Sequence, residues 1–378
     1  MRIPYSSDSL RHSSNPFRRR LAPVLLALLL MVVAACSDSS TDPAEDLGFL
    51  AGADGDPRIG VVVNSTENAL RLIQLGDPSE VRTIGLGASS SITATSLTSR
   101  GEDLVVPLGN AASVAHVNAR TRAVERIFLF DGGNASGSLH VGGDRFLVLN
   151  LLDDQVGAFE LGQDSDDITE LQDVPPAPSS LVDTPAGVAV VSGNLDENFQ
   201  PLGDGIVTFV DGQTLEVLGE VGTGGPNAGP AALGPDGLLY VVNTGNFVDP
   251  SSMAIIDPTG PTLVEVVDGL APGSGSLHID ASGTAWISGF GFGTTAWDTG
   301  SRSFLRGPDN PVCVEVEGVC LGAASATTDD AGRLLQVHFG APGDGVPGQI
   351  FVFGGSAFEL EEEIEAGQGP TFVEVRTF

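Results

Sequence analysis

The sequence predicts an all-β protein, a seven-bladed β-propeller closed by the C-terminal strand pairing into the first blade. Three observations lead to this fold class. From Pro57 onward, short apolar or alternating runs are separated by Gly, Asp, Asn and Pro turns, and no long segment has a helical period. A four-strand pattern recurs roughly every 45 residues, the length of one blade with its loops. The final copy of that pattern is divided between the two ends of the repeat region.

The repeats are aligned by their predicted inner strands, which start in similar small-residue motifs. These strands begin near Ser89, Ser136, Pro178, Ala228, Ser274, Ala324 and Gly369. Each is followed by an apolar second strand, such as Val61 to Val63 in the first repeat and Leu238 to Val242 in the fifth. A strand that is apolar on both faces is expected where its sheet packs between two others.

The two ends of the repeat region complement each other. Three strands precede Ser89, whereas a single strand, TFVEVRTF, follows Pro370. We therefore expect the C-terminal strand to complete the first blade, which removes the free edges of an open sheet. A count of six or eight blades would require one segment to be divided differently.

The first 35 residues have the pattern of a lipoprotein signal peptide. Three arginines, Arg18 to Arg20, precede an apolar stretch that ends in Val33-Ala34-Ala35 before Cys36. The small residues followed directly by Cys36 resemble the bacterial lipobox, which implies lipidation of Cys36; ordinary secretion with an incidental cysteine is the alternative. Ser37 then indicates delivery to the outer membrane. Residues 36–56 are predicted to be an acidic flexible tether, and residues 57–378 the propeller.

The charge of the chain excludes several kinds of partner. Without residues 1–35 the chain keeps 12 of its 17 basic and 48 of its 49 acidic residues, a formal charge of −36, and it contains no lysine. Such a field repels phosphate backbones, so we expect no nucleic-acid partner. The same field opposes contact between the protein body and an anionic membrane surface, so we expect contact with the membrane through the lipid anchor only. Stable anchoring by lipid needs more than one acyl chain. The protein is expected to be a monomer.

Two cysteines remain once Cys36 is assigned to the lipid. Cys313 and Cys320 flank the segment VEVEGV, and an even pair in an oxidising compartment predicts a disulfide across a small loop. A metal site is the alternative, but it would need further Cys or His ligands nearby in the sequence.

Two strand motifs resemble those of YVTN-type bacterial propellers, and the turn pattern is similar to that of NHL-like propellers. The first is Tyr240-Val241-Val242-Asn243-Thr244, and the second is Val61-Val62-Val63-Asn64-Ser65. The resemblance covers about residues 57–378 and implies a cell-envelope lipoprotein with this fold. It implies no particular function, because propellers include both binding modules and enzymes.

The loops predicted between second and third strands differ among the blades. They are short in blades 1 to 3 and longer in blades 4 to 7, where they share one face with the Cys313–Cys320 loop. Long loops on a rigid scaffold are where binding residues usually lie. The candidate binding face comprises Asp196, Glu197, Phe199, Asp204, Phe247, Asp249, Phe290, Phe292, Phe339 and Asp344. The alternative interpretation is that these phenylalanines fold back over the ends of the blades.

Signals for catalysis are weak. The sequence has no Gly-x-Ser-x-Gly motif, and His140 and His278 occupy equivalent positions three blades apart, too distant to share a metal. Gluconolactonase-like propellers hold a divalent cation in the channel, and Asn150, Asn194 and Asn243 could contribute to such a site or could form turns. No catalytic residue, metal ligand or cofactor is assigned, although the acid excess would suit calcium.

These observations predict a lipid-anchored cell-envelope propeller that acts as a non-enzymatic binding or scaffolding module. Its partner would be an envelope protein or a glycan. The alternative function is a metal-dependent envelope hydrolase of the gluconolactonase-like type.

Overall fold

The computed structural model describes residues 47–378, which form one compact unit. The predicted signal peptide and Cys36 lie outside the described residues. The compact unit begins at Leu47, before the predicted start at Pro57. A short 3-10 helix, η1 (Gly48–Ala51), places Leu50 in the apolar layer between the first two blades, and Gln74 Nε2 donates to the carbonyl oxygen of Phe49 over 2.8 Å. Within residues 47–378, neither of the short helices has the length or the apolar composition of a membrane-spanning segment.

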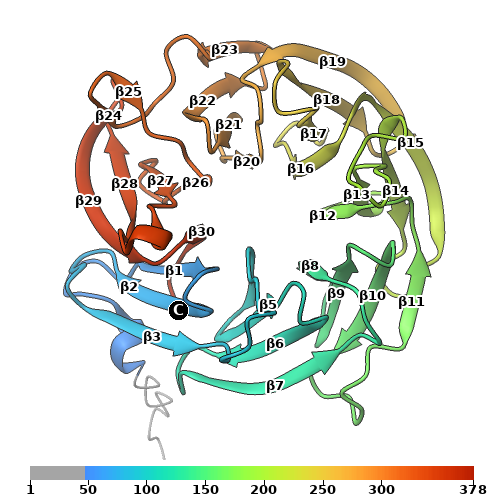
Figure 1. Cartoon of the computed structure of the whole chain (residues 1–378), viewed down its shortest axis with the longest axis horizontal. Coiled ribbons are helices and arrows are strands. Elements are labelled where there is room, and N and C mark those ends of the chain that lie inside the picture. Colours follow the sequence, from blue (N-terminus) through green and yellow to red (C-terminus); the bar gives the residue numbers. More distant parts are fainter. Residues whose placement is uncertain (1–46) are drawn as a thin grey trace, which may run out of the picture. The chain divides into compact units, whose positions relative to one another are not determined.

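Seven four-stranded antiparallel sheets stand around a ring within the described part of the chain (Figure 1). Blade 1 contains β30 (Pro370–Arg376), β1 (Ile59–Asn64), β2 (Ala69–Gln74) and β3 (Val81–Gly85). Blade 2 contains β4 (Thr98–Arg100), β5 (Asp103–Pro107), β6 (Ser113–Asn118) and β7 (Ala123–Leu129). Blade 3 contains β8 (Ala135–His140), β9 (Arg145–Asn150), β10 (Gln155–Glu160) and β11 (Glu170–Asp173).

The other four blades follow in chain order. Blade 4 contains β12 (Pro178–Thr184), β13 (Gly187–Ser192), β14 (Asp204–Val210) and β15 (Val217–Pro226). Blade 5 contains β16 (Ala228–Leu233), β17 (Leu239–Asn243), β18 (Ser251–Asp257) and β19 (Thr262–Leu270). Blade 6 contains β20 (Ser276–Ile279), β21 (Thr284–Gly289), β22 (Phe292–Asp298) and β23 (Ser303–Arg306). Blade 7 contains β26 (Ser325–Thr328), β27 (Leu334–His338), β28 (Gly348–Gly354) and β29 (Glu359–Gly367).

Smaller elements lie in the loops of the last two blades. A two-stranded hairpin of β24 (Glu315–Val316) and β25 (Val319–Cys320) is part of the connection from blade 6 to blade 7. A second 3-10 helix, η2 (Pro342–Asp344), lies between β27 and β28.

The predicted closure of the ring is confirmed. β30 pairs with β1 in antiparallel register, with Val62 opposite Val373 and Val63 opposite Phe372. The backbone N–H of Ser65 also donates to the carbonyl oxygen of Gly369 over 2.9 Å. The last strand of the chain is therefore the innermost strand of the first blade, as Figure 1 shows.

Seven apolar layers separate the blades in the described part of the chain, one at each interface. β1 shows how one strand contributes to two layers. Val61 and Val63 pack toward blade 2, whereas Val62 packs toward blade 7. Successive side chains of a strand point to opposite faces, so a strand between two layers must be apolar at every position. This geometry explains the continuous apolar second strands of the sequence.

The inner strand of blade 2 lies later in the chain than predicted. We expected it near Ser89, but residues 86–97 form the connection from blade 1, and β4 is the short strand Thr98–Arg100. β4 pairs with β5 through a tight turn at Gly101, whose φ of 57° is in the left-handed region. The small-residue motif near Ser89 resembles those of the other blades but lacks this adjoining turn.

Removing residues 371–378 is expected to destabilise the whole ring, because β30 fills blade 1 and buries Val373 between blades 7 and 1. Thermal and urea unfolding followed by circular dichroism would then show a large fall in Tm and a broadened transition. The control is removal of residues 377 and 378 alone, which leaves β30 intact. A truncated protein that unfolds at the wild-type temperature in one cooperative step would contradict this role of β30.

Candidate functional site

The strand order gives the ring two different faces. In each blade, the loop between second and third strands lies on the same face as the connection to the next blade, because antiparallel strands alternate in direction. We call this the upper face and the opposite one the lower face. All loops that carry the predicted binding residues belong to the upper face.

The predicted residues lie at the upper ends of four consecutive blades. In blade 4, Asp196, Glu197 and Phe199 are in the β13–β14 loop and Asp204 begins β14. In blade 5, Phe247 and Asp249 are in the β17–β18 loop. Phe290 is in the β21–β22 turn of blade 6 and Phe292 begins β22, while Phe339 and Asp344 are in the β27–β28 loop of blade 7. The loop of blade 6 is not long as predicted. Gly289 pairs with Phe292, so Phe290 and Gly291 alone form the turn.

Three of the five phenylalanines are exposed rather than folded over the blade ends. The exposed fraction is 53% for Phe199, 68% for Phe247 and 66% for Phe290. Phe292 and Phe339 are half-buried, and the ring of Phe339 contacts that of Phe290 edge to face at a centroid distance of 5.7 Å. The predicted exposed binding face thus describes Phe199, Phe247 and Phe290, whereas the alternative of rings folded over the blade ends describes Phe292 and Phe339.

Further apolar side chains on the same face were not identified from the sequence. Leu202, Val248, Val316, Val319 and Val346 are each at least half exposed and lie in the upper loops of blades 4 to 7 or in the β24–β25 hairpin. Together with Phe199, Phe247 and Phe290, they are named here the upper apolar residues. The sequence signal that could have identified them is an apolar residue inside a loop rich in Gly, Asp and Pro.

Two of the exposed phenylalanines occupy unusual backbone conformations. Phe199 has a φ of 57° and Phe247 a φ of 65°, the left-handed region that bulky side chains rarely adopt. Neighbouring carboxylate and amide groups hold these loops in place. Asp196 accepts hydrogen bonds from the backbone N–H groups of Asn198 and Gln200, and Asn246 accepts one from that of Asp249. Such backbone strain often accompanies binding or catalytic sites.

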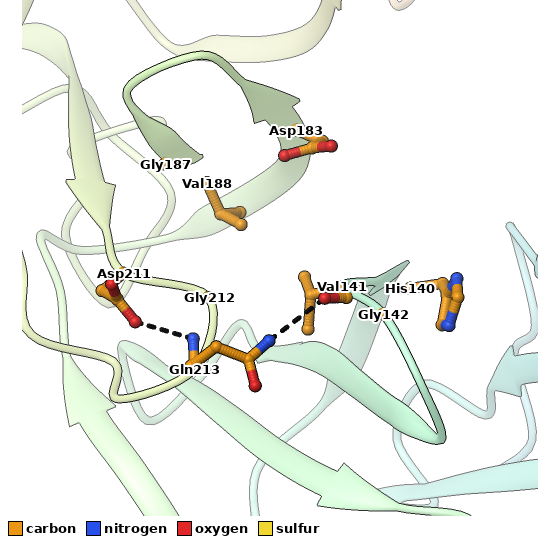
Figure 2. Close-up of a pocket in the computed structure, with 9 residues that line it drawn as sticks. All are labelled: His140, Val141, Gly142, Asp183, Gly187, Val188, Asp211, Gly212 and Gln213. Carbon is orange, nitrogen blue, oxygen red and sulfur yellow. Dashed lines mark hydrogen bonds between the residues drawn. The ribbon is translucent and has the colours of Figure 1, made fainter.

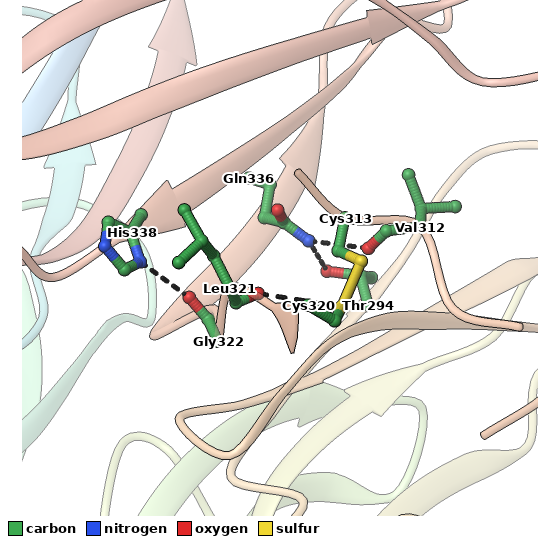
Figure 3. Close-up of a disulfide and its surroundings, with 8 residues drawn as sticks. All are labelled: Thr294, Val312, Cys313, Cys320, Leu321, Gly322, Gln336 and His338. Atoms are coloured by element: carbon green, nitrogen blue, oxygen red, sulfur yellow. Dashed lines mark hydrogen bonds between the residues drawn. A yellow bond between two sulfur atoms is a disulfide. The ribbon is translucent and has the colours of Figure 1, made fainter. Parts of the chain in front are cut away.

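The predicted disulfide between Cys313 and Cys320 is confirmed, with a Cα–Cα distance of 5.7 Å (Figure 3). The strap, which we define as residues 307–324, carries this disulfide and the β24–β25 hairpin. Buried Gln336 fixes its base, because Nε2 donates to both Thr294 Oγ1 and the carbonyl oxygen of Val312 over 2.9 Å. The strap also packs tightly on β22, since a Cβ at Gly293 would lie 2.3 Å from the Val312 oxygen.

The three asparagines considered for a channel cation bind the backbone or nearby side chains instead. Asn150 is buried, accepts a hydrogen bond from the N–H of Asn134 and donates to Asp153. Asn194 donates to the carbonyl oxygen of Asp204, and Asn243 donates to Ser252 Oγ. These contacts agree with the turn-forming interpretation. The described residues contain no group of three or more His, Cys, Asp or Glu side chains placed to hold a metal ion.

The lower face has hollows between blades. One hollow, of about 460 Å³, lies between blades 3 and 4 and is lined by His140, Asp183 and Gln213 (Figure 2). Gln213 spans it, donating through Nε2 to the carbonyl oxygen of Val141 over 3.1 Å and through its backbone N–H to Asp211 over 2.8 Å.

The corresponding hollow between blades 6 and 7 measures about 650 Å³ and contains His278. The His278 ring is within 2.9 Å of Thr328 Oγ1, and Trp286 donates to Asp280 over 3.0 Å. His140 and His278 therefore line separate hollows, as their spacing predicted. Because Gln213, His278 and Trp286 already have partners, we interpret the lower hollows as interfaces between blades.

Comparison with known proteins identifies the fold. No protein-family model matches the sequence, and a search among curated proteins gives no match. Among solved structures, hydrazine synthase from Kuenenia stuttgartiensis is similar, with a TM-score of 0.59 and 15% sequence identity over 77% of this chain and 97% of that chain. A similarity at this level of identity concerns the propeller fold alone.

The stability of the protein is expected to fall as the pH drops below about 6.5, in part because of His278. Burial lowers the pKa of His278 in the folded protein below its ordinary value of 6.5. The unfolded chain therefore takes up the proton first, so the contribution of neutral His278 is complete above pH 6.5 and is lost below it. Urea unfolding of wild type and His278→Gln between pH 5 and pH 7.5 measures this slope.

The control for this titration is His140→Gln, at the equivalent position of blade 3, where the half-buried ring has its Nε2 2.9 Å from the carbonyl oxygen of Gly143. We expect a shallower pH dependence for His278→Gln alone. Equal slopes for the wild type and His278→Gln would show that the burial of His278 does not contribute.

Proposed function

We propose that this protein is a lipid-anchored envelope propeller that binds a partner protein on its upper face, through the loops of blades 4 to 7. The observation that carries the proposal is the gathering of exposed apolar side chains on that face. All but three of the large apolar residues in the described part that are at least half exposed belong to the upper apolar residues. The three are Leu152, in the upper turn of blade 3, and Leu218 and Leu305, on outer strands. Exposed apolar surface that is concentrated in one region is typical of interaction sites.

The energy available from this face suits a protein partner. Burying a fully exposed phenylalanine in an interface contributes up to about 3 kcal/mol, and several such side chains project from neighbouring loops. Aromatic side chains are also the residues that most often dominate binding energy. The rigid ring holds the loops in fixed positions, which lowers the entropic cost of binding.

The charge of the same loops specifies the partner further. Residues 193–203, 244–250, 307–324 and 339–347 include seven acidic side chains and no arginine, lysine or histidine. An apolar surface with acidic surroundings complements a partner that is apolar at the centre of its contact and basic at the edge. Such complementarity raises the association rate and restricts the choice of partner.

The anchor is inferred from the sequence. The signal pattern and the small residues before Cys36 favour lipidation of Cys36. Ser37 favours the outer membrane. An anchored ring of this kind would hold its partner near the membrane while the acidic body is repelled from anionic lipid.

The metal-dependent hydrolase is less well supported as a function. Such an enzyme needs several oxygen or nitrogen ligands around a cation. Asn150, Asn194 and Asn243 have turn-forming contacts, and the side chains around the upper mouth of the channel are not ionisable. These observations favour binding over catalysis.

Photo-crosslinking in the native envelope tests the proposed face. A crosslinking amino acid at position 199 or 247 is expected to give one discrete adduct with a single protein, whereas the same residue at position 218 or 305 gives none. The double variant Leu202→Ser/Val248→Ser should reduce the adduct and weaken binding of the purified partner at least tenfold, about 1.4 kcal/mol. Both side chains are largely exposed, so the variant should fold normally.

The matched control is Leu218→Ser/Leu305→Ser, which removes apolar side chains that are about half exposed from outer strands and should leave the adduct unchanged. Binding that weakens equally in the two double variants would contradict the assignment of the upper face. A partner whose contact surface is acidic would also contradict the proposal.

Lipidation is tested independently of the partner. Labelled fatty acid is expected in the wild-type protein and not in Cys36→Ser, which should also move from the membrane to the soluble fraction after lysis. Cys313→Ser/Cys320→Ser serves as the control and should keep the label. Label retained in Cys36→Ser would overturn the anchor while leaving the upper-face proposal intact.

A further inference from the structure

A cavity of about 380 Å³ opens at the centre of the ring on the upper face. Its wall is made by the inner strands of several blades, including β12, β16, β20, β26 and β30, and by the blade 6 turn that carries Phe290. The volume is within the range of small-molecule sites in proteins, about 300–1,000 Å³. Phe290 is the one upper apolar residue that lines this cavity, so the cavity adjoins the proposed partner face and shares that single residue with it.

The chemistry of the wall differs from that of the rest of the protein. The chain has 49 acidic residues, yet no ionisable side chain lines this cavity. Six hydroxyl side chains line it, together with apolar groups such as Leu277 and Phe372; the hydroxyls belong to Thr95, Ser96, Ser180, Ser276, Ser325 and Thr371. A charged ligand would lose water here without gaining an opposite charge. A purely apolar ligand would leave the hydroxyl groups unpaired.

Ser325 distinguishes this cavity from an ordinary channel. Its side chain is 7% exposed, and its Oγ has no hydrogen-bond partner within the described part of the chain. Two neighbouring hydroxyl groups do have partners, because Ser96 Oγ donates to the carbonyl oxygen of Ser136 and Thr371 Oγ1 to that of Thr95. A buried hydroxyl group without a partner is costly. The Oγ atom is covered in this conformation. Rotation of the Ser325 side chain to another staggered rotamer would turn the hydroxyl toward the cavity, where a polar ligand would supply the partner.

Phe290 forms a fixed aromatic wall at the mouth. Its ring packs edge to face on Phe339, while two thirds of the side chain stays exposed. The strap holds the turn from behind, since the N–H of Ala323 donates to the carbonyl oxygens of Gly289 and Phe292 over 3.0 Å. Gly322 lies so close that a Cβ there would be 1.9 Å from the Phe290 oxygen. The aromatic ring therefore needs little further ordering when a ligand binds.

From this geometry we propose that the central cavity binds an uncharged saccharide. A pyranose ring offers hydroxyl groups for Ser325 and the neighbouring serines and threonines, and its C–H face can lie on the Phe290 ring. The absence of ionisable side chains in the wall selects against sugar acids, which the negative field of the protein also repels.

Calorimetry and saturation-transfer NMR on the intact protein test this proposal. The probes are methyl glucoside, methyl galactoside, N-acetylglucosamine and its disaccharide, with glucuronate as the charged analogue. At least one neutral probe is expected to bind with one-to-one stoichiometry, and at least about tenfold more tightly than glucuronate. Ser325→Ala and Phe290→Ala should each weaken that binding by about threefold to tenfold.

Two matched variants separate binding from stability. Ser192→Ala removes another buried hydroxyl group without a described partner, on β13 and outside the cavity. Phe199→Ala removes an exposed ring from the upper loop of blade 4. Both should bind the saccharide as the wild type does, and all four variants should keep the wild-type Tm within a few degrees. A fall in affinity for Ser192→Ala equal to that for Ser325→Ala would assign the effect to the fold.

The proposal is overturned if none of the neutral probes binds at tens of millimolar, if glucuronate binds as tightly as they do, or if a blocked uncharged tripeptide binds in their place. Wild-type affinity in both Ser325→Ala and Phe290→Ala would also overturn it. Photo-crosslinking from positions 199 and 247 should be unaffected by Ser325→Ala. The saccharide site and the partner face can therefore fail separately.

Discussion

The pairing of β30 with β1 is the constraint on which the rest of the structure depends. β1 contributes alternate side chains to the apolar layers on both sides of blade 1, and β30 adds Val373 to the layer shared with blade 7. Each blade is too thin to bury its own apolar residues, so its stability comes from its two neighbours. A break at one interface therefore exposes a layer and weakens the support of every loop around the ring.

The two faces of the ring differ in how their charges are balanced. Many arginines pair with carboxylates at the lower ends of the blades, as in the contacts of Arg58 with Asp329 and of Arg145 with Glu170. The upper loops of blades 4 to 7 have acids but no such partners of their own in the sequence. The ion pairs of the lower face thus lie between blades, as for Arg58 and Asp329, or within one blade, as for Arg145 and Glu170. The upper face keeps many of its apolar and acidic groups exposed to solvent.

Much of the fold could be predicted from the sequence, because it depends on local patterns. The continuous apolar second strands, the divided first blade and the Cys313–Cys320 pair each had a pattern that the structure matches. The position of β4 could not be predicted, since it depends on pairing with β5 rather than on its own composition. The two-residue turn at Phe290 was not predicted, because a Gly-rich segment is compatible both with a tight turn and with a longer loop.

The candidate site was less predictable than the fold. The sequence located Phe199, Phe247 and Phe290 on one face, but their exposure depends on how each loop folds over its neighbours. The central cavity was not predicted, although the small-residue motifs of the inner strands contribute much of its wall. Its wall is assembled from single serines, threonines and apolar residues that are far apart in the chain and meet only when the ring closes.

The strap links completion of the cavity to formation of the Cys313–Cys320 disulfide. The turn that carries Phe290 is held by the strap, because Gly322 packs against the Phe290 backbone and the N–H of Ala323 donates to the carbonyl oxygens of Gly289 and Phe292. The Cys313–Cys320 bond closes a loop within the same strap. The ring itself needs no such bond, because its blades are held by apolar layers and strand pairing. A chain that folds in a reducing compartment would therefore have the propeller before it has the finished site. For the proposed saccharide site, oxidation would therefore act as a maturation step, which limits the finished site to the compartment where disulfides form.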